Sequence, residues 1–151
     1  MQLIDLNSGL EVIDRAECLR LLAGEEVGRL GVVVGGRPEI FPVNFALDGD
    51  CVIFRTDPGT KLAAAVRDPV VFEVDRLDHA TRSAWSVIIH GRADHVTPYG
   101  SPALLHRTAH LALYPWSGAS KAHLLRIVPN TITGRRIGPR GSGAGTTPPA
   151  H

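Results

Sequence analysis

The hydrophobic and polar positions of this 151-residue chain form one helical segment near the start and β-type segments after it. In the helical segment the apolar residues recur at a spacing of three or four, at Ala16, Leu19, Leu22 and Ala23. Asp14 and Glu17 have the spacing of a capping box, so we expect a helix that starts after Asp14 and ends at Gly24. The preceding Met1–Ile13 has no clear period and predicts an extended lead-in or a short pairing strand.

From Val27 onward the pattern changes to short runs of β-branched and aromatic residues separated by glycine-containing turns. Gly35-Gly36 and Asp48-Gly49-Asp50 suit tight turns, so we expect consecutive runs to pair as antiparallel hairpins. The last run should bend near Pro129-Asn130. The expected strands are Val27–Val34, Pro38–Leu47, Cys51–Thr56, Val70–Asp75, Ala84–Val96 and Leu124–Ile137.

Two short helices interrupt these strands. Leu62–Val66 is alanine-rich and stops before Asp68-Pro69, and Ser101–Leu113 has the capping pattern of a second helix. Six sequential strands with few helices predict a mainly β (α+β) fold, a six-stranded antiparallel barrel with helical plugs. We expect a single domain over residues 1–137 and a disordered tail over residues 138–151, which is rich in Gly, Pro, Ser and Thr.

The stretch from Arg55 to Lys61 joins the third expected strand to the alanine-rich helix. Pro58-Gly59 breaks the strand, and the helix begins near Thr60. Its first amides have no partner inside the helix, and the helix dipole places positive charge there. The stretch is therefore a candidate phosphate cradle. Its possible donors are Arg55, Thr56, Thr60 and Lys61.

An ordinary turn is the alternative for this stretch, with Thr56 or Asp57 capping the helix and with Arg55 and Lys61 as solvated charges. The spacing is not that of a Walker A loop, because only one glycine precedes Lys61 and Leu62 stands at the hydroxyl position. Nucleoside triphosphate chemistry is therefore disfavoured.

The composition indicates which kinds of partner and which cellular compartment to expect for this protein. The formal net charge of +1 provides no general basic field, so nucleic acid is not expected. Cys18 and Cys51 form no C-x-x-C motif, which favours reduced thiols in a cytoplasmic protein. No apolar run is long enough to span a bilayer, and Met1–Leu10 lacks the basic start of a signal peptide. We expect a cytoplasmic protein without membrane contact.

Several short motifs occur in an order and spacing that extend over Val12–Ile137. The chain resembles the pyridoxamine 5'-phosphate oxidase-like family of flavin-binding split β-barrels, and the likeness is strongest to small actinobacterial-type members. The motifs are Gly28-Arg29-Leu30, Phe41-Pro42-Val43-Asn44, Arg55-Thr56 with Gly59-Thr60-Lys61, Trp85-Ser86-Val87, Tyr114-Pro115-Trp116 and the run from Arg126 to Arg135.

The resemblance implies a homodimer with FMN in two equivalent grooves at the subunit interface. By resemblance, the flavin phosphate is held at Arg55, Thr56 and Lys61, with Thr60 beside them. The isoalloxazine ring is lined through backbone and amide contacts by Pro42, Val43 and Asn44. Further contacts come from Trp85, Ser86, Trp116 and Arg126, the last two expected from the other subunit.

The function implied by the resemblance is that of an FMN-binding oxidoreductase acting on an unknown small molecule. Three alternatives stay open: a reductase that uses the deazaflavin coenzyme F-420, a non-enzymatic flavin carrier or sensor, and a haem-binding split barrel with His90 or His110 on the iron. Pyridoxamine phosphate oxidation itself is less favoured, because the chain is short and a second phosphate-binding cluster is missing. A metal site at His106 and His110 is disfavoured, since no third ligand is apparent.

Overall fold

A computed structural model describes residues 3–4, 10–56, 59–96, 102–103, 106 and 123–138. The strands are β1 Leu3–Ile4, β2 Glu11–Ile13, β3 Val27–Val34, β4 Arg37–Asp48, β5 Cys51–Thr56, β6 Val70–Asp78, β7 Ser83–His95 and β8 His123–Ile137. The helices are α1 Arg15–Ala23 and α2 Thr60–Arg67. Of the expected helix Ser101–Leu113, Pro102, Ala103 and His106 are helical, and the remainder lies outside the described residues, as does the tail from Pro139.

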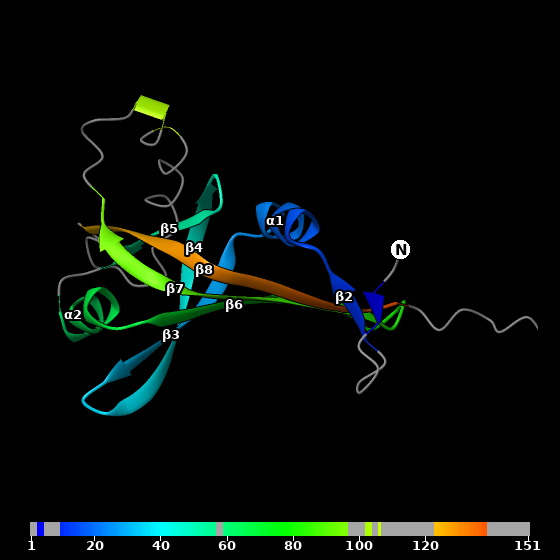
Figure 1. Cartoon of the computed structure of the whole chain (residues 1–151), viewed down its shortest axis with the longest axis horizontal. Coiled ribbons are helices and arrows are strands. Elements are labelled where there is room, and N and C mark those ends of the chain that lie inside the picture. The colour runs from blue at the N-terminus through cyan, green and yellow to red at the C-terminus, as the bar shows by residue number, and fades with distance from the viewer. Residues whose placement is uncertain are drawn as a thin grey trace, which may run out of the picture.

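The strands form one antiparallel sheet in the order β1-β2-β8-β5-β4-β3-β6-β7, and β7 also pairs with β8. This last pairing closes β3 to β8 into a six-stranded barrel, and β1 and β2 extend it at the free end of β8 (Figure 1). The predicted mainly β fold, a six-stranded antiparallel split barrel with short helices, is confirmed.

The barrel interior is filled by one side of each strand. Phe45, Phe54 and Phe72 are almost completely buried, and the rings of Phe45 and Phe72 meet edge to face at 5.1 Å between centroids. α2 packs against β3 and β7 and buries Ala65 against the same core. Because inward and outward side chains alternate, each strand also carries a set of residues on the outer surface of the barrel.

Asp14 caps α1 as predicted, with the backbone N–H of Glu17 donating to Asp14 Oδ1 at 2.8 Å, while the Glu17 carboxylate binds Arg20 and Arg136. The predicted apolar face is confirmed at Leu22, which is fully buried, and wrong at Ala16 and Ala23, which are exposed; Cys18 is also fully buried. The helix packs against β8 at Gly134, where a Cβ atom would lie only 2.6 Å from Cys18 Sγ. A cysteine side chain fits this close approach, and burial raises the pKa of its thiol.

The bend predicted near Pro129-Asn130 is confirmed as a β-bulge. His90 pairs with Thr131 and Gly91 pairs with Pro129, so Asn130 has no counterpart on β7. At Gly91 the strands come so close that a Cβ atom would lie 2.3 Å from the carbonyl oxygen of Val128. Only glycine allows this approach.

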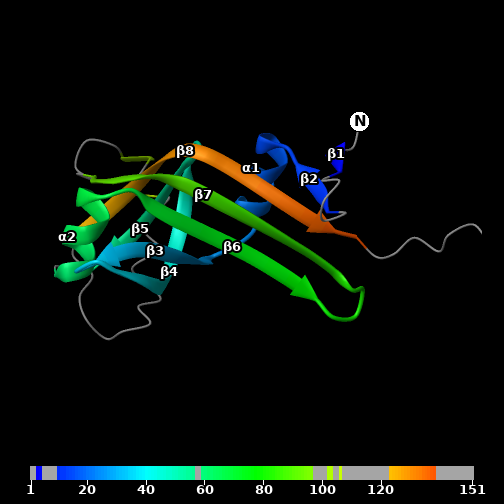
Figure 2. The same ribbon diagram turned by 60° about the horizontal axis from the view of Figure 1, so that its bottom comes forward.

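The β6–β7 hairpin is longer than predicted. β6 continues to Asp78 rather than ending at Asp75, and the hairpin projects beyond the barrel at the end opposite α2 (Figure 2). The exposed Arg76-Leu77-Asp78 lack the alternating burial of a core strand, so their sequence gives no strand signal. Cross-strand pairing with β7 and a turn in which Asp78 Oδ1 accepts from Ala80 N and Thr81 N hold this segment extended.

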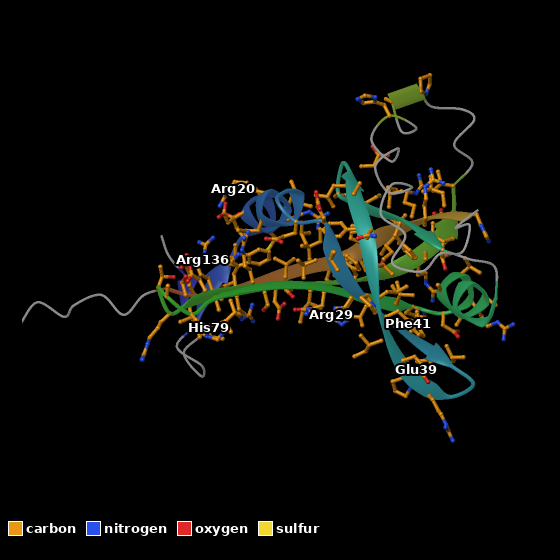
Figure 3. The ribbon with its side chains drawn as sticks, turned by 180° about the vertical axis from the view of Figure 1, so that it is seen from behind. Arg20, Arg29, Glu39, Phe41, His79 and Arg136 are labelled. Carbon is orange, nitrogen blue, oxygen red and sulfur yellow. The ribbon has the colours of Figure 1, made fainter. Side chains whose placement is uncertain are left out.

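Glu17 ties α1 to the end of β8. Its carboxylate accepts from Arg20 Nε at 2.6 Å and from Arg136 Nη2 at 2.7 Å, and Figure 3 shows the two arginines at the same end of the molecule. These hydrogen bonds, first that of Arg20 and then that of Arg136, lower the pKa of Glu17 to about 2.

We therefore expect this carboxylate to stabilise the fold fully above pH 4.5, its ordinary pKa, and to lose that contribution as the pH falls toward about 2. The Glu17→Gln variant should show a shallower decline of the free energy of unfolding over this interval, measured by urea denaturation at successive pH values. Parallel declines in the two proteins would show that Glu17 is not coupled to folding.

Candidate functional site

The candidate phosphate cradle lies on the outer face of β5, where that strand meets β8 and the start of α2. Val52 and Phe54 point into the barrel, so Ile53 and Arg55 face outward. Arg55 lies opposite Leu124 on β8, and Ile53 lies opposite Arg126. Ile53 and Leu124 are buried in a second apolar cluster, separate from the barrel core, which also includes Ala46, Cys51 and Val96.

Arg55 has an unusual hydrogen-bonding environment. Its Nε atom is buried and has no hydrogen-bond partner within the described part of the chain. Buried donors are nearly always paired, because an unpaired one costs about 1–3 kcal/mol. A donor left in this state is suited to an acceptor that the protein itself does not supply.

The start of α2 adds backbone donors near the end of β5. The helix begins at Thr60 with Gly59 as its N-cap residue, so neither Thr56 nor Asp57 occupies the cap position, contrary to the simple capped-turn alternative. Gly59 has a φ of 151° and no side chain that could cap the first turn. Within the described residues no side-chain cap is formed at this end of α2, so its first amides are suited to an anion. Thr60 and Lys61 lie in this turn.

Arg126, which was expected to come from the other subunit, shares the outer face with Arg55 of the same chain. Because Arg126 pairs with Ile53, two residues before Arg55 on β5, the two arginines are diagonal neighbours on adjacent strands, at a separation of about 7–8 Å. The Arg126 guanidinium is bound by Asp94 of β7, with Nη2 to Oδ2 at 3.0 Å and Nε to Oδ1 at 3.3 Å. This hydrogen bonding raises the pKa of Arg126, which stays a cation.

Three candidate residues on β4 divide between its two faces. Val43 is buried in the barrel core, so only its backbone can serve a ligand on the outer surface. Pro42 and Asn44 point outward. Asn44 precedes Phe45 on β4, and Arg55 follows Phe54 on β5. Because Phe45 pairs with Phe54 on these antiparallel strands, Asn44 and Arg55 lie opposite each other on the same face.

Trp85 and Ser86 lie far from this cradle. Ser86 pairs with Arg135 on β8, eleven residues along the strand from Leu124, which pairs with Arg55. At the rise of a β-strand this is about 35 Å, and Figure 2 shows the β6–β7 hairpin and α2 at opposite ends of the barrel. A single chain therefore does not bring Ser86 to the Arg55 cradle.

Trp85 lines a groove of its own at the hairpin end. The groove has a volume of about 230 Å³ and lies between the hairpin, β8 and Leu10. Its walls are mainly apolar and include Leu77, Ala84 and Ile137 besides the tryptophan, and Arg76 and Arg136 also line it. The described site residues predicted from sequence thus fall into two groups at opposite ends of the barrel, while Trp116 lies outside the described residues.

Sequence reasoning missed Asp94. Its pairing with Arg126 depends on the register between β7 and β8, which no local motif reveals. Within the residues the structure describes, no group of three or more His, Cys, Asp and Glu side chains could hold a metal ion. Nor does that part of the chain contain a helix long and apolar enough to cross a membrane. Burial raises the pKa of the Cys51 thiol, which disfavours a thiolate nucleophile.

Known proteins are similar to this chain in sequence and in fold. A model of the pyridoxamine 5'-phosphate oxidase family matches residues 14–136. The chain belongs to this family. The "FAD binding protein from Mycobacterium smegmatis" is 32% identical and superposes with a TM-score of 0.64, over 85% of this chain and 98% of that one. A Corynebacterium diphtheriae protein of unknown function, DIP1874, is 33% identical with a TM-score of 0.61 over the same shares of each chain.

The chain is also similar to a protein of Mycobacterium tuberculosis. The uncharacterized protein Rv0080 is 34% identical over 131 residues, which cover 83% of this chain and 84% of Rv0080. The similarity therefore extends over nearly the full length of both proteins.

Proposed function

We propose that this chain is a flavin-binding protein, and more specifically an FMN-dependent oxidoreductase acting on a small molecule. The observation that carries the proposal is the buried Arg55 Nε, which lacks an acceptor in the described part of the chain and lies near the uncapped start of α2. A phosphate group fits this donor set, because guanidinium groups and helix N-termini both bind phosphate oxygens. Flavin binding by the 32%-identical M. smegmatis protein supports the choice of ligand.

The residues of this chain would bind and orient the cofactor. Arg55 and the first amides of α2 would hold the phosphate, with Thr60 and Lys61 in the same turn. Asn44 and Pro42 would contact the remainder of the flavin along β4. The bound flavin itself supplies the electron transfer, so the protein needs no catalytic dyad of its own.

Hydrogen bonds to the phosphate alone would bind flavin weakly. Each charge-assisted hydrogen bond contributes about 1.5–3 kcal/mol, whereas association costs an estimated 4–15 kcal/mol. Burial of the flavin ring must supply the difference, at roughly 25 cal/mol per Å² of apolar surface. The outer face of one barrel leaves such a ring open on one side.

We therefore include a second copy of the chain in the proposed site. Trp85 and Ser86, at the far end of the molecule, would complete the cradle of a partner, and the apolar groove beside Trp85 suits an interface. Ile40 is 69% exposed and Val33 is 44% exposed, both on the outer face of the β3–β4 hairpin. Exposed apolar side chains grouped in this way are typical of an association surface.

The first test is the visible spectrum of the purified protein, alone and after addition of FMN, FAD, coenzyme F-420 or haemin. We expect flavin absorption bands and saturable binding of FMN. Bleaching by an anaerobic nicotinamide donor would support an oxidoreductase, whereas tight binding without turnover would support a carrier or sensor. Failure to bind any flavin would refute the proposal.

FAD is the second candidate cofactor, because the M. smegmatis relative is described as FAD binding. Its second phosphate and adenosine would extend from the cradle along the partner, and a lower dissociation constant for FAD than for FMN would select it. Preferential binding of F-420, or a Soret band with haemin, would select the deazaflavin or haem alternative. A cytoplasmic location stays a prediction, consistent with the free thiols of Cys18 and Cys51.

A further inference from the structure

Arg126 is held by a carboxylate of its own chain. Asp94 lies directly opposite Arg126 on the paired strands β7 and β8, and each carboxylate oxygen accepts one hydrogen bond from the guanidinium. The side chain of Arg126 is 39% exposed and that of Asp94 is 54% exposed. The ion pair therefore lies on the outer face where Arg55 also lies, within reach of a ligand bound there.

The Asp94 carboxylate binds only one edge of the Arg126 guanidinium. A guanidinium carries five N–H donors, and Asp94 occupies only the edge formed by Nε and Nη2. The donors of Nη1 can still meet a phosphate oxygen. The negative charge of Asp94, however, offsets the positive charge of Arg126, so an anion between Arg55 and Arg126 meets two cations and one carboxylate.

We propose that Asp94 is a specificity-determining residue of the flavin site, which lowers the affinity for a terminal, doubly charged phosphate. The inference rests on the proposed flavin-binding function. A phosphate monoester such as that of FMN carries a charge of about −1.5 to −2 at neutral pH, whereas each phosphate of the FAD pyrophosphate carries a single negative charge. Coulomb repulsion scales with charge and falls with distance, and the second phosphate of FAD would extend away from the cradle along the partner, so Asp94 disfavours FMN more than FAD and leaves riboflavin unaffected.

Asp94 also orients the Arg126 side chain, which would favour binding and oppose the charge effect. The orienting effect is the weaker one at this site. An exposed ion pair restrains a long side chain only slightly, whereas the charge of the carboxylate acts on the phosphate in every rotamer. The sign of the net effect is therefore set by electrostatics.

The test is the Asp94→Asn variant, which keeps the shape of the side chain and removes its charge. At low ionic strength we expect the dissociation constant for FMN to fall about two- to fivefold, with a smaller fall for FAD and no change for riboflavin. The increase in FMN affinity should be smaller at high salt, because salt screens exposed charges. A purely structural effect of the substitution would change the dissociation constants for FMN, FAD and riboflavin alike.

Two further variants isolate the mechanism. Asp50→Asn is the matched control, because Asp50 forms a similarly exposed ion pair with Arg15 at 2.7 Å, with side chains 48% and 49% exposed. It should leave every constant unchanged. In an Arg126→Gln background Asp94 has no arginine to orient, so only its charge acts on the phosphate, and Asp94→Asn should lower the dissociation constant for FMN at least as much as in the wild-type background.

The outcomes separate this inference from the function on which it rests. If the wild-type protein binds flavin but Asp94→Asn binds FMN no more tightly, or shifts FMN, FAD and riboflavin equally, the role of Asp94 is overturned and flavin binding stands. If the wild-type protein binds no flavin at all, both proposals fail together.

Discussion

Replacing Arg55 with methionine is expected to weaken FMN binding about 10- to 100-fold for each charge-assisted hydrogen bond that is lost. The same change should leave the free energy of unfolding of the flavin-free protein unchanged or slightly higher. The reason is that the buried Arg55 Nε has no partner within the described chain, so its removal relieves an unsatisfied donor. Methionine preserves most of the apolar stem of the side chain.

Fluorescence titration of FMN and riboflavin, together with urea denaturation of the flavin-free protein, measures both effects. Riboflavin lacks the phosphate, so its affinity should change little. Arg67→Met is the matched control, because it removes an exposed arginine from the last turn of α2, the helix whose first turn forms part of the cradle. If Arg55→Met lowers stability as much as it lowers binding, Arg55 is a structural residue and the cradle is not a ligand site.

Placing a charge at Ile40 is expected to dissociate the protein and to release flavin in the same concentration range. Ile40 is 69% exposed, so Ile40→Asp should not disturb the folding of the single chain. In a twofold dimer the carboxylate would be buried twice, and desolvation of an unpaired charge is costly. Because the proposed site takes Trp85 and Ser86 from the partner, flavin affinity should fall together with dimerisation.

Light scattering during size-exclusion chromatography would give the mass, and flavin absorbance across a dilution series would give the occupancy. Arg37→Ala is the control, since it changes the net charge by the same amount on the same hairpin. The Arg37 side chain points to the opposite face of β4 from Ile40. A wild-type protein that is monomeric and still binds FMN tightly would contradict the two-chain site.

The strands could be predicted because local patterns specify them. In β5 and β7 the alternation of inward and outward residues matches the core that the structure shows, and the Gly35-Gly36 turn has the positive φ values of 56° and 77° that only glycine adopts easily. The Arg55 cradle could also be proposed, since strand, turn and helix start follow one another along the chain.

The remaining features depend on register and on contacts between distant segments. The apolar face of α1 is set by the space that Gly134 leaves for Cys18, more than one hundred residues away. The Asp94–Arg126 pair and the separation of Ser86 from Arg55 both follow from how β8 is aligned with β5 and β7. Periodicity predicts which residues share a face of one strand, but it does not fix the neighbour on the next strand.

The separation of Arg55 and Ser86 along one chain has a genetic consequence for the proposed dimer. Each site would draw Arg55 from one gene product and Ser86 from the other. Two alleles that are each inactive, one altered at Arg55 and one at Ser86, would then complement one another, because a mixed dimer concentrates both defects in one site and leaves the second site intact. Cells carrying both alleles would retain flavin binding that neither allele provides alone.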